Sequence, residues 1–111
     1  MIKVYVAGPL STGGYSDSCK NIRHAIDVGH ELMTKGFAPY VPHYSHFANL
    51  FHMQTWQDWM DQDKIWVHSC DALLRLPGES KGADVEVGWA QAARIPVFTT
   101  IEGLVAWAKE R

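Results

Sequence analysis

The sequence predicts an α/β fold: a three-layer doubly wound sheet, flavodoxin- or Rossmann-like, with about four to five mostly parallel strands. Two observations predict it. Short apolar segments rich in Val, Ile, Leu and Ala alternate along the chain with longer segments of helical periodicity. These apolar segments are almost continuous, as expected of strands that helices cover on both faces.

Three elements are expected in the first part of the chain: a strand at 2–7, a helix from about Asp17 or Ser18 to Gly36, and a strand at 37–41. The helix is expected because apolar residues recur three and four positions apart from Ile22 to Met33, and a glycine follows them. Pro39 cannot donate a backbone hydrogen bond, so the second strand is expected at an edge of the sheet or to end irregularly. Residues 43–54 are ambiguous.

Thr55 is a residue type that caps helices, and it precedes a helix that is expected to run to about Ser69. The elements expected after it are a strand at 71–76, a helix at 82–94, a strand at 96–99 and a helix at 101–109. In parallel sheets of this kind, ligands bind outside the carboxyl ends of the strands. Those ends are here the segments 8–14, 42–46 and 77–82.

Length and composition favour one domain, residues 1–111. The net charge of −2 and the pI near 6.3 provide no basic field for nucleic acid, and no apolar run approaches the ~20 residues of a membrane helix. Cys19 and Cys70 form no CxxC pair, and the first ten residues do not resemble a signal peptide. We therefore expect a reduced, cytoplasmic protein without nucleic-acid or membrane partners.

One carboxylate interrupts an apolar stripe. Trp56, Trp59, Met60 and Trp66 share a face of the helix after Thr55, and Asp63 lies on the same face. A carboxylate beside tryptophans has a raised pKa and can give a proton. The alternative is that Asp63 lies at the edge of the stripe and bonds a backbone group.

A second carboxylate, Glu86, lies on a line of small residues formed by Ala83, Ala90 and Ala93. It is the only long side chain on that line, so the helix can approach other backbone or a ligand closely at this point. A first-turn acid that the helix dipole favours is the simpler interpretation, but Asp84 can fill that role as well. Glu86 is therefore a candidate functional carboxylate.

Ser80, Lys81 and Gly82 open the same helix, and free amides, a hydroxyl and an ammonium together favour anion binding. Ser80 can also act simply as the N-cap, and the two roles are compatible. His43 and His46 form an HxxH pair, but a metal site needs a third ligand, so no metal or cofactor is expected. His43 is expected to line a substrate pocket or an interface.

The order and spacing of these motifs resemble the nucleoside 2-deoxyribosyltransferase superfamily. The matching segments are VYVAGPLS, DQDKIWVHSCDALL and GESKGADVEVGWA. The sequence is similar to the 2′-deoxynucleoside 5′-phosphate N-hydrolase branch, and more so to small uncharacterised bacterial and phage members. The resemblance spans most of the chain.

The resemblance implies roles for several residues. Glu86 matches the glutamate that attacks the anomeric carbon of the sugar, and Asp63 the aspartate that contacts the leaving base and helps to protonate it. Tyr5 matches the tyrosine that orients the nucleophile. Ser80 and Gly8 match a serine and a loop glycine that approach the 5′-phosphate. Two carboxylates in different environments suit this reaction, because breaking an N-glycosidic bond needs an anion at the sugar and a proton at the leaving group.

The substrate-binding residues expected from these arguments are Gly8, Pro9, Leu10, Ser11, His43, Gly78, Ser80, Lys81 and Gly82. Ser11 replaces the basic residue that the hydrolase branch has in its first loop. A phosphate would therefore be held by Ser11, Thr12, Gly14, Ser80 and Lys81. The sequence ends soon after the last expected helix, without the segment that in the transferases reaches into a neighbouring site, which favours hydrolysis.

The expected function is cleavage of the N-glycosidic bond of a (deoxy)nucleoside 5′-monophosphate, with a small-molecule nucleoside or nucleotide as ligand. Three alternatives remain: a nucleoside deoxyribosyltransferase, a non-catalytic nucleotide-binding or sensory module, and an NAD glycohydrolase. The resemblance and the five tryptophans also favour a homodimer or larger homo-oligomer.

Overall fold

The computed structural model describes residues 1–11 and 14–111. In chain order its elements are β1 (Lys3–Ala7), α1 (Tyr15–Thr34), β2 (Ala38–Tyr40), the 3₁₀ helix η1 (Pro42–Tyr44), α2 (Ser45–Phe51), α3 (Trp56–Ser69), β3 (Ala72–Arg75), α4 (Lys81–Ala92), β4 (Val97–Phe98) and α5 (Ile101–Lys109). The four strands form one parallel sheet in the order β2-β1-β3-β4. The predicted fold class is confirmed, including the position of the Pro39 strand at an edge.

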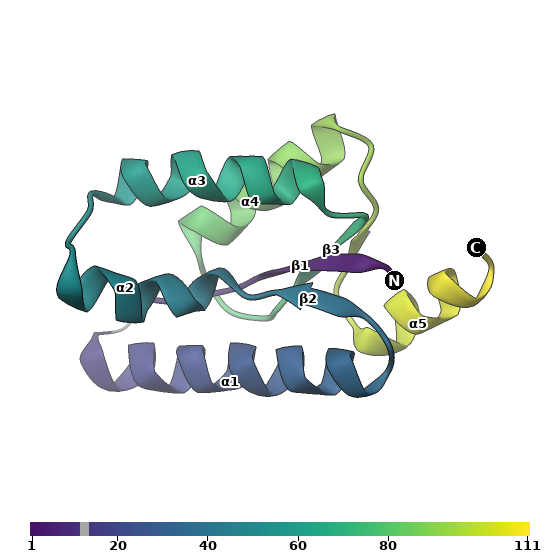
Figure 1. Cartoon of the computed structure of the whole chain (residues 1–111), viewed down its shortest axis with the longest axis horizontal. Helices are drawn as coiled ribbons and strands as arrows, with labels where there is room; N and C mark the ends of the chain where they lie inside the picture. Colours follow the sequence, from purple (N-terminus) through teal and green to yellow (C-terminus); the bar gives the residue numbers. More distant parts are fainter. Residues whose placement is uncertain (12–13) are drawn as a thin grey trace.

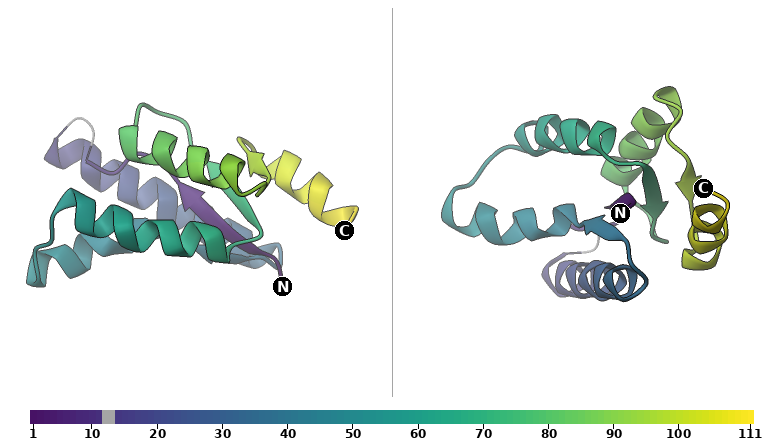
Figure 2. Two further views of the ribbon diagram at one scale, coloured as in Figure 1. Left: turned by 90° about the horizontal axis from the view of Figure 1, so that it is seen from above. Right: turned by 45° about the vertical axis from the view of Figure 1, so that its right-hand side comes forward.

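Helices cover the sheet on both faces, as Figure 1 shows. Helices α3 and α4 lie side by side on one face, which is seen from above in the left view of Figure 2. Helices α1 and α5 pack on the other face. The three layers follow from the right-handed crossovers that join successive parallel strands.

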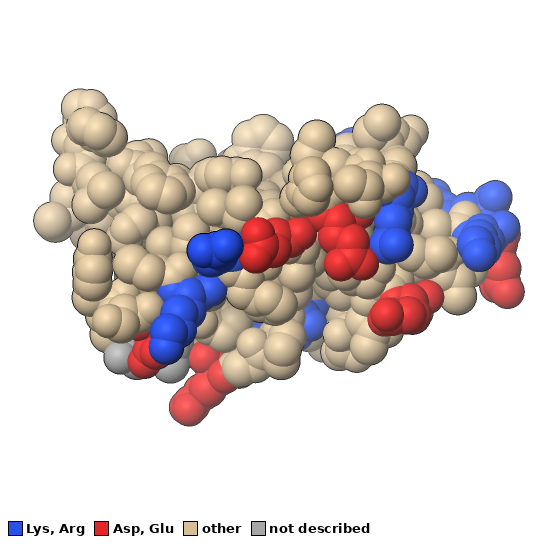
Figure 3. All heavy atoms as spheres, turned by 90° about the horizontal axis from the view of Figure 1, so that it is seen from below, with Lys and Arg blue, Asp and Glu red and all other residues tan. Residues whose placement is uncertain are grey.

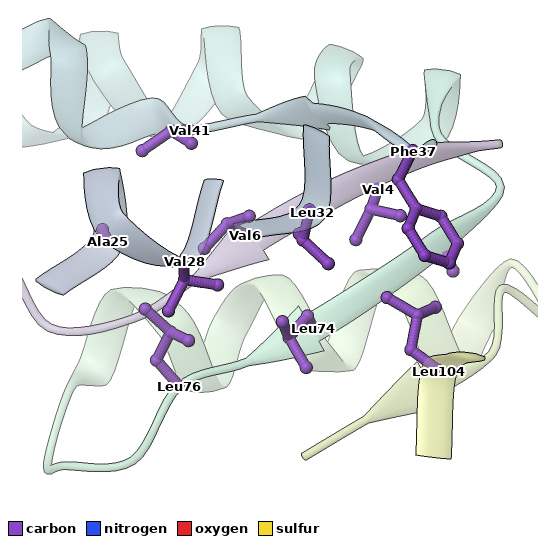
Figure 4. Packing of buried hydrophobic residues seen from close by; sticks show 11 residues of the cluster. Val4, Val6, Ala25, Val28, Leu32, Phe37, Val41, Leu74, Leu76 and Leu104 are labelled. Atoms are coloured by element: carbon purple, nitrogen blue, oxygen red, sulfur yellow. The ribbon is translucent and has the colours of Figure 1, made fainter. Parts of the chain in front are cut away.

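The strand β1 divides the core between these two faces, because successive side chains of a strand point to opposite sides. Val4 and Val6 pack toward α1 and α5 in the cluster that Figure 4 shows. Tyr5 and Ala7 point toward α3 and α4. All four side chains are fully buried, which confirms the expectation of a strand covered on both faces.

One helix boundary differs from the expectation, and one ambiguous segment is now assigned. Helix α1 begins at Tyr15, two residues before the expected start at Asp17, because the Ser18 hydroxyl lies within the first turn and donates to the carbonyl oxygen of Gly14 at 2.8 Å. Gly14 takes the N-cap position with a positive φ of 97°, which a glycine adopts without strain. The ambiguous segment 43–54 contains most of η1 and all of α2.

The loops after β1 and β3 are packed closely against each other at the carboxyl edge of the sheet. A Cβ atom on Gly8 would lie 2.9 Å from the Cβ atom of Leu76, and one on Gly78 would lie 2.8 Å from the ring of Pro9. The amide of Leu76 donates to the carbonyl oxygen of Ala7 at 2.7 Å. These contacts fix the relative position of two loops that the sequence places at a ligand site.

The surface over α1 carries interspersed acidic and basic side chains, as the view from below in Figure 3 shows. Exposed pairs one helical turn apart contribute to this pattern, such as Arg23 with Asp27 and Lys35 with Glu31. The end of the molecule at which α2 lies is largely without charge in this view. None of the helices in the described part of the chain has the length and apolar character that a membrane span requires.

Candidate active site

A cavity of about 240 Å³ opens at the carboxyl edge of the sheet. It lies between the loop after β1, the segment from η1 to α2, one face of α3 and the beginning of α4. Its lining residues are Gly8, Leu10, Ser11, Pro42, His43, Ser45, Trp56, Trp59, Met60, Asp63, Ser80, Lys81, Gly82, Ala83 and Glu86. The structure therefore brings both candidate carboxylates to one cavity.

Helix α4 holds Glu86 at the floor of this cavity. Its buried alanines, Ala83 and Ala90, allow the helix to pack closely against the sheet, so the Glu86 side chain is only 5% exposed. The hydroxyl of Tyr5, on the adjacent strand β1, donates a hydrogen bond to Oε2 of Glu86. The pKa of Tyr5 is raised, first by burial and then by the charge of Glu86, so the phenol stays neutral and acts as a donor.

Asp63 approaches the same point from α3 and is half-buried. Its carboxyl group lines the same cavity as that of Glu86, and it interacts electrostatically with Glu86 and Tyr5. These two partners come from other elements, and they account for the place of Asp63 in an apolar stripe. Two carboxyl groups that interact in a partly buried cavity lose their protons in two steps that belong to the pair.

Burial raises the pKa of both carboxyl groups, that of Asp63 to about 6 and that of Glu86 to about 8. For Glu86 the negative charge of Asp63 adds to the effect of burial, whereas the hydrogen bond from Tyr5 opposes it. At neutral pH the pair therefore holds one proton, and burial favours its residence on Glu86. The sequence pointed to a raised pKa for Asp63 alone, and the structure adds the larger shift of Glu86.

The first turn of α4 forms one wall of the cavity. Ser80 is the N-cap, because its hydroxyl oxygen accepts a hydrogen bond from the amide of Ala83 at 3.1 Å. The next two residues, Lys81 and Gly82, line the cavity, and amides at these helix positions have no partner within the helix. The ammonium of Lys81 lies 5.6 Å from the ring centre of Trp56. A helix terminus of this kind favours an anion in the cavity.

The loop after β1 contributes Gly8, Leu10 and Ser11 to the cavity. Pro9 and Gly78, which were also expected to bind substrate, do not line it; they pack against each other behind the wall. Thr12 lies outside the described residues. Gly14, which was also expected to hold a phosphate, does not line the cavity. The other seven of the nine expected substrate-binding residues do line it.

His43 lines the cavity and is almost fully buried. One of its ring nitrogens, Nε2, donates to the carbonyl oxygen of Pro9 at 2.9 Å, and burial lowers its pKa, so the ring is neutral. The ring of His46 instead meets that of Phe47 edge-on. In the described part of the chain, no three His, Cys, Asp or Glu side chains are placed together as metal ligands.

Trp59 lines the cavity, and its indole is oriented by Asn49, a residue that the sequence analysis did not identify. The indole nitrogen of Trp59 donates to Oδ1 of Asn49 at 2.9 Å, and Asn49 Oδ1 also accepts from the amide of Gln54. These bonds hold the end of α2 against the beginning of α3. The stripe of tryptophans was visible in the sequence, but nothing marked Asn49 as the residue that orients one of them.

A family described as "Domain of unknown function (DUF4406)" matches residues 2–99. A search of the curated proteins finds no match. Among solved structures, the fold is similar to that of a protein titled "2-desoxiribosyltransferase from Leishmania mexicana", with a TM-score of 0.61 and 20% sequence identity. The similarity covers 87% of this chain and 62% of that one. At this identity the likeness concerns the fold, and it confirms the fold that the sequence resemblance implied.

The raised pKa values predict that Glu86→Gln stabilises the protein increasingly as the pH rises. A carboxyl group whose pKa is higher in the folded than in the unfolded state favours folding at low pH, and this contribution is lost as the pH rises toward about 8. A glutamine cannot ionise, and it can still accept from Tyr5. We expect the gain in Tm to be small at pH 5 and to reach several degrees at pH 8.5, measured by thermal unfolding.

Glu110→Gln is the matched control, because Glu110 is exposed at the end of α5. Its Tm difference from the wild type should not grow with pH. Equal Tm differences at both pH values for Glu86→Gln would show that Glu86 is not a buried acid with a raised pKa.

Proposed function

The chain belongs to the DUF4406 family, and we propose that it is an N-glycosidase that cleaves the bond between base and sugar in a (deoxy)nucleoside 5′-monophosphate. The observation that carries this proposal is the convergence of two carboxyl groups, Glu86 and Asp63, on one cavity beside a helix N-terminus. The fold is similar to that of a protein titled as a 2-desoxiribosyltransferase, which supports the same class of bond.

The pair supplies both groups that the reaction needs. When the proton held by the pair resides on Asp63, Glu86 is an anion whose position Tyr5 holds. Glu86 then attacks C1′, the bond from C1′ to the base nitrogen breaks, and Asp63 gives its proton to the departing base. The products of this step are a free base, an Asp63 carboxylate and a glycosyl ester on Glu86.

Water completes the cycle. Its oxygen attacks C1′, the ester bond to Glu86 breaks, and the proton that the water loses goes to Asp63. The pair again carries one proton, and the net reaction consumes one water molecule. With water as the acceptor the net reaction is hydrolysis. When a ring nitrogen of a second base attacks C1′ in place of water, the same ester is the intermediate of a transferase.

The residues that line the cavity favour one orientation of a bound nucleotide, with its phosphate at α4 and its base at α3. The N-terminus of α4, with Lys81 and Ser80, favours the phosphate, and Ser11 lies in the same lining. The adjoining wall on α3 carries the indoles of Trp56 and Trp59, and Asp63 lies on the same helix. Stacking on an aromatic ring stabilises a base by about 1–3 kcal/mol, and it places the leaving nitrogen near the proton donor.

A chromatographic assay tests this function directly. Purified protein is incubated with deoxynucleoside 5′-monophosphates, ribonucleoside 5′-monophosphates, unphosphorylated nucleosides and NAD, and free base is measured. We expect free base from one or more of the monophosphates and a loss of at least about 10³-fold in kcat with Glu86→Gln, because the attacking oxygen is replaced by an amide. Asp63→Asn should slow poor leaving bases most.

The remaining outcomes of the assay identify the alternatives. Unchanged nucleotides with a measurable binding isotherm indicate a binding module, nicotinamide released from NAD indicates an NAD glycohydrolase, and glycosylation of an added second base indicates a transferase. Undiminished turnover in Glu86→Gln contradicts the assignment of the nucleophile.

We also propose that the exposed face of α2 is covered by a second copy of this chain. Helix α2 is seven residues long and has no buried residue, and it swings away from the sheet in the right view of Figure 2. So short a helix is not stable alone in water. The large apolar side chains exposed on it and beside it are Tyr44, Phe47, Leu50, Phe51, Met53 and Trp56.

The exposed apolar area and the absence of charged residues both favour a second copy of this chain as the partner of this face. At about 200 Å² for a large side chain, these six expose roughly 800 Å², which is what each partner of a standard protein interface buries. Residues 36–57 contain no Lys, Arg, Asp or Glu, so two identical faces meet without repulsion. Trp56 and Ser45 also line the cavity, so a second copy on this face closes part of its rim.

We expect the wild type to be a dimer in sedimentation equilibrium, and Leu50→Asp to be a monomer, because the introduced charge would be buried in the interface. Met33→Ser is the matched control: Met33 is similarly exposed, but on α1, and its removal should leave the dimer intact. A monomeric wild type at every concentration, or a dimer that persists in Leu50→Asp, contradicts this proposal and leaves the proposed reaction untouched.

A further inference from the structure

Arg75, the last residue of β3, bonds to three different parts of the cavity's supporting turn. Its guanidinium donates to the carbonyl oxygen of Leu76, to that of Gly78 at 3.0 Å and to Oδ1 of Asp84 at 2.9 Å. The Arg75 side chain is 15% exposed, whereas that of Asp84 is 72% exposed. The guanidinium group of Arg75 thus links the end of β3, the following turn and the first turn of α4.

These bonds hold the turn against which the Pro9 ring also packs. Gly78 has a positive φ of 113°, and its α-carbon faces the Pro9 ring so closely that no side chain fits. Arg75 holds the carbonyl oxygens on either side of Pro77. The position of the N-cap, Ser80, is therefore set by a turn that is clamped between a proline ring and a guanidinium.

Arg75 also acts on Glu86 through its charge. The groups that interact electrostatically with the Glu86 carboxyl come from four elements: Tyr5 on β1, Tyr40 on β2, Asp63 on α3 and Arg75 on β3. Burial and Asp63 disfavour the ionised form of Glu86, and Arg75 is the cation that opposes them. Lys81 lines the same cavity, but its ammonium lies over the ring of Trp56.

The exposed ion pair with Asp84 does not by itself explain this arrangement. Pairs with one solvent-exposed partner contribute little to stability, about 0–1 kcal/mol at the median. Charged hydrogen bonds to the two carbonyl oxygens are stronger and more directional. The guanidinium is therefore held mainly by the turn. From this position its positive charge acts on the carboxyl group of Glu86.

We propose that Arg75 is a positioning residue of the site: it clamps the turn at 76–80 so that the N-terminus of α4 receives the 5′-phosphate, and it directs a positive charge toward Glu86. The proposal rests on the function proposed above. The two effects depend on different properties of the side chain. The hydrogen bonds that hold the turn need the planar guanidinium of an arginine, whereas the electrostatic effect on Glu86 needs only a positive charge.

Two substitutions separate the effects in the hydrolysis assay. Arg75→Gln removes fork and charge: KM for the 5′-monophosphate should rise several-fold, and the alkaline limb of the kcat/KM profile should move to higher pH by up to about one unit, because the ionised form of Glu86 loses its cation. Arg75→Lys keeps the charge, so the alkaline limb should stay in place while KM still rises. Arg23→Gln, on an exposed pair of α1, is the matched control and should change neither.

A double-mutant cycle tests the field without any turnover. In the proposed arrangement, Glu86→Gln raises Tm at pH 8.5 more in the Arg75→Gln background than in the wild type, because the ionised Glu86 is more costly without Arg75. A purely structural clamp gives additive changes. If Arg75→Gln does not fold, the same cycle is measured with Arg75→Lys, which should be additive because the charge remains, and non-additivity there contradicts the proposal.

These experiments distinguish a failure of the role proposed for Arg75 from a failure of the proposed N-glycosidase function. If no nucleotide is cleaved but the Arg75→Gln cycle is non-additive, the field is supported and the proposed function fails. If nucleotides are cleaved while Arg75→Gln leaves KM, the alkaline limb and the additivity unchanged, Arg75 is structural and the inference is overturned.

Discussion

The electrostatic interaction between the carboxyl groups of Glu86 and Asp63 in one cavity is the interaction on which the rest of the site depends. Burial and the mutual repulsion of two carboxylates disfavour ionisation of both groups, so the pair retains a proton up to a pH at which isolated acids have lost theirs. The arrangement costs stability, because an apolar pair would fill the same space without desolvating a charge. A cost of this kind, at the ligand edge of a parallel sheet, is typical of a site that uses its carboxyl groups.

The fold explains how residues far apart in sequence come to share that proton. Parallel strands end at one edge, so Tyr5 on β1 and the helix that follows β3 reach the same place. Alanines on α4 permit close packing and leave room for one long side chain. Helix α3 brings Asp63 across from the other side, and the tight contacts of Gly8 and Gly78 fix the loops between them. The chemistry proposed here is thus a consequence of topology combined with a few small residues.

The sequence predicted the alternation of strands and helices well, because the apolar strands and the cap at Thr55 are local signals. It also marked Glu86 and Asp63, since an acid on an apolar or small-residue line breaks a pattern that can be read without a structure. The resemblance to a known family added Tyr5, whose contact spans 81 positions. The sequence did not mark Arg75 or Asn49, because their partners are backbone carbonyl oxygens and an indole nitrogen, which leave no trace in residue spacing. Helix α2 was ambiguous for a related reason: it buries nothing within its own chain, so its apolar residues follow no period set by a core.

The most direct test of the shared proton is a ¹³C titration of the Asp and Glu side-chain carboxyl groups by NMR, assigned with Glu86→Gln and Asp63→Asn. We expect two steps with apparent pKa values near 6 and 8 that belong to the pair, with both carbons responding in each step. Either substitution should reduce the remaining titration to a single step. Two independent titrations near the ordinary values of about 4, unaffected by the substitution of the other residue, would contradict the account.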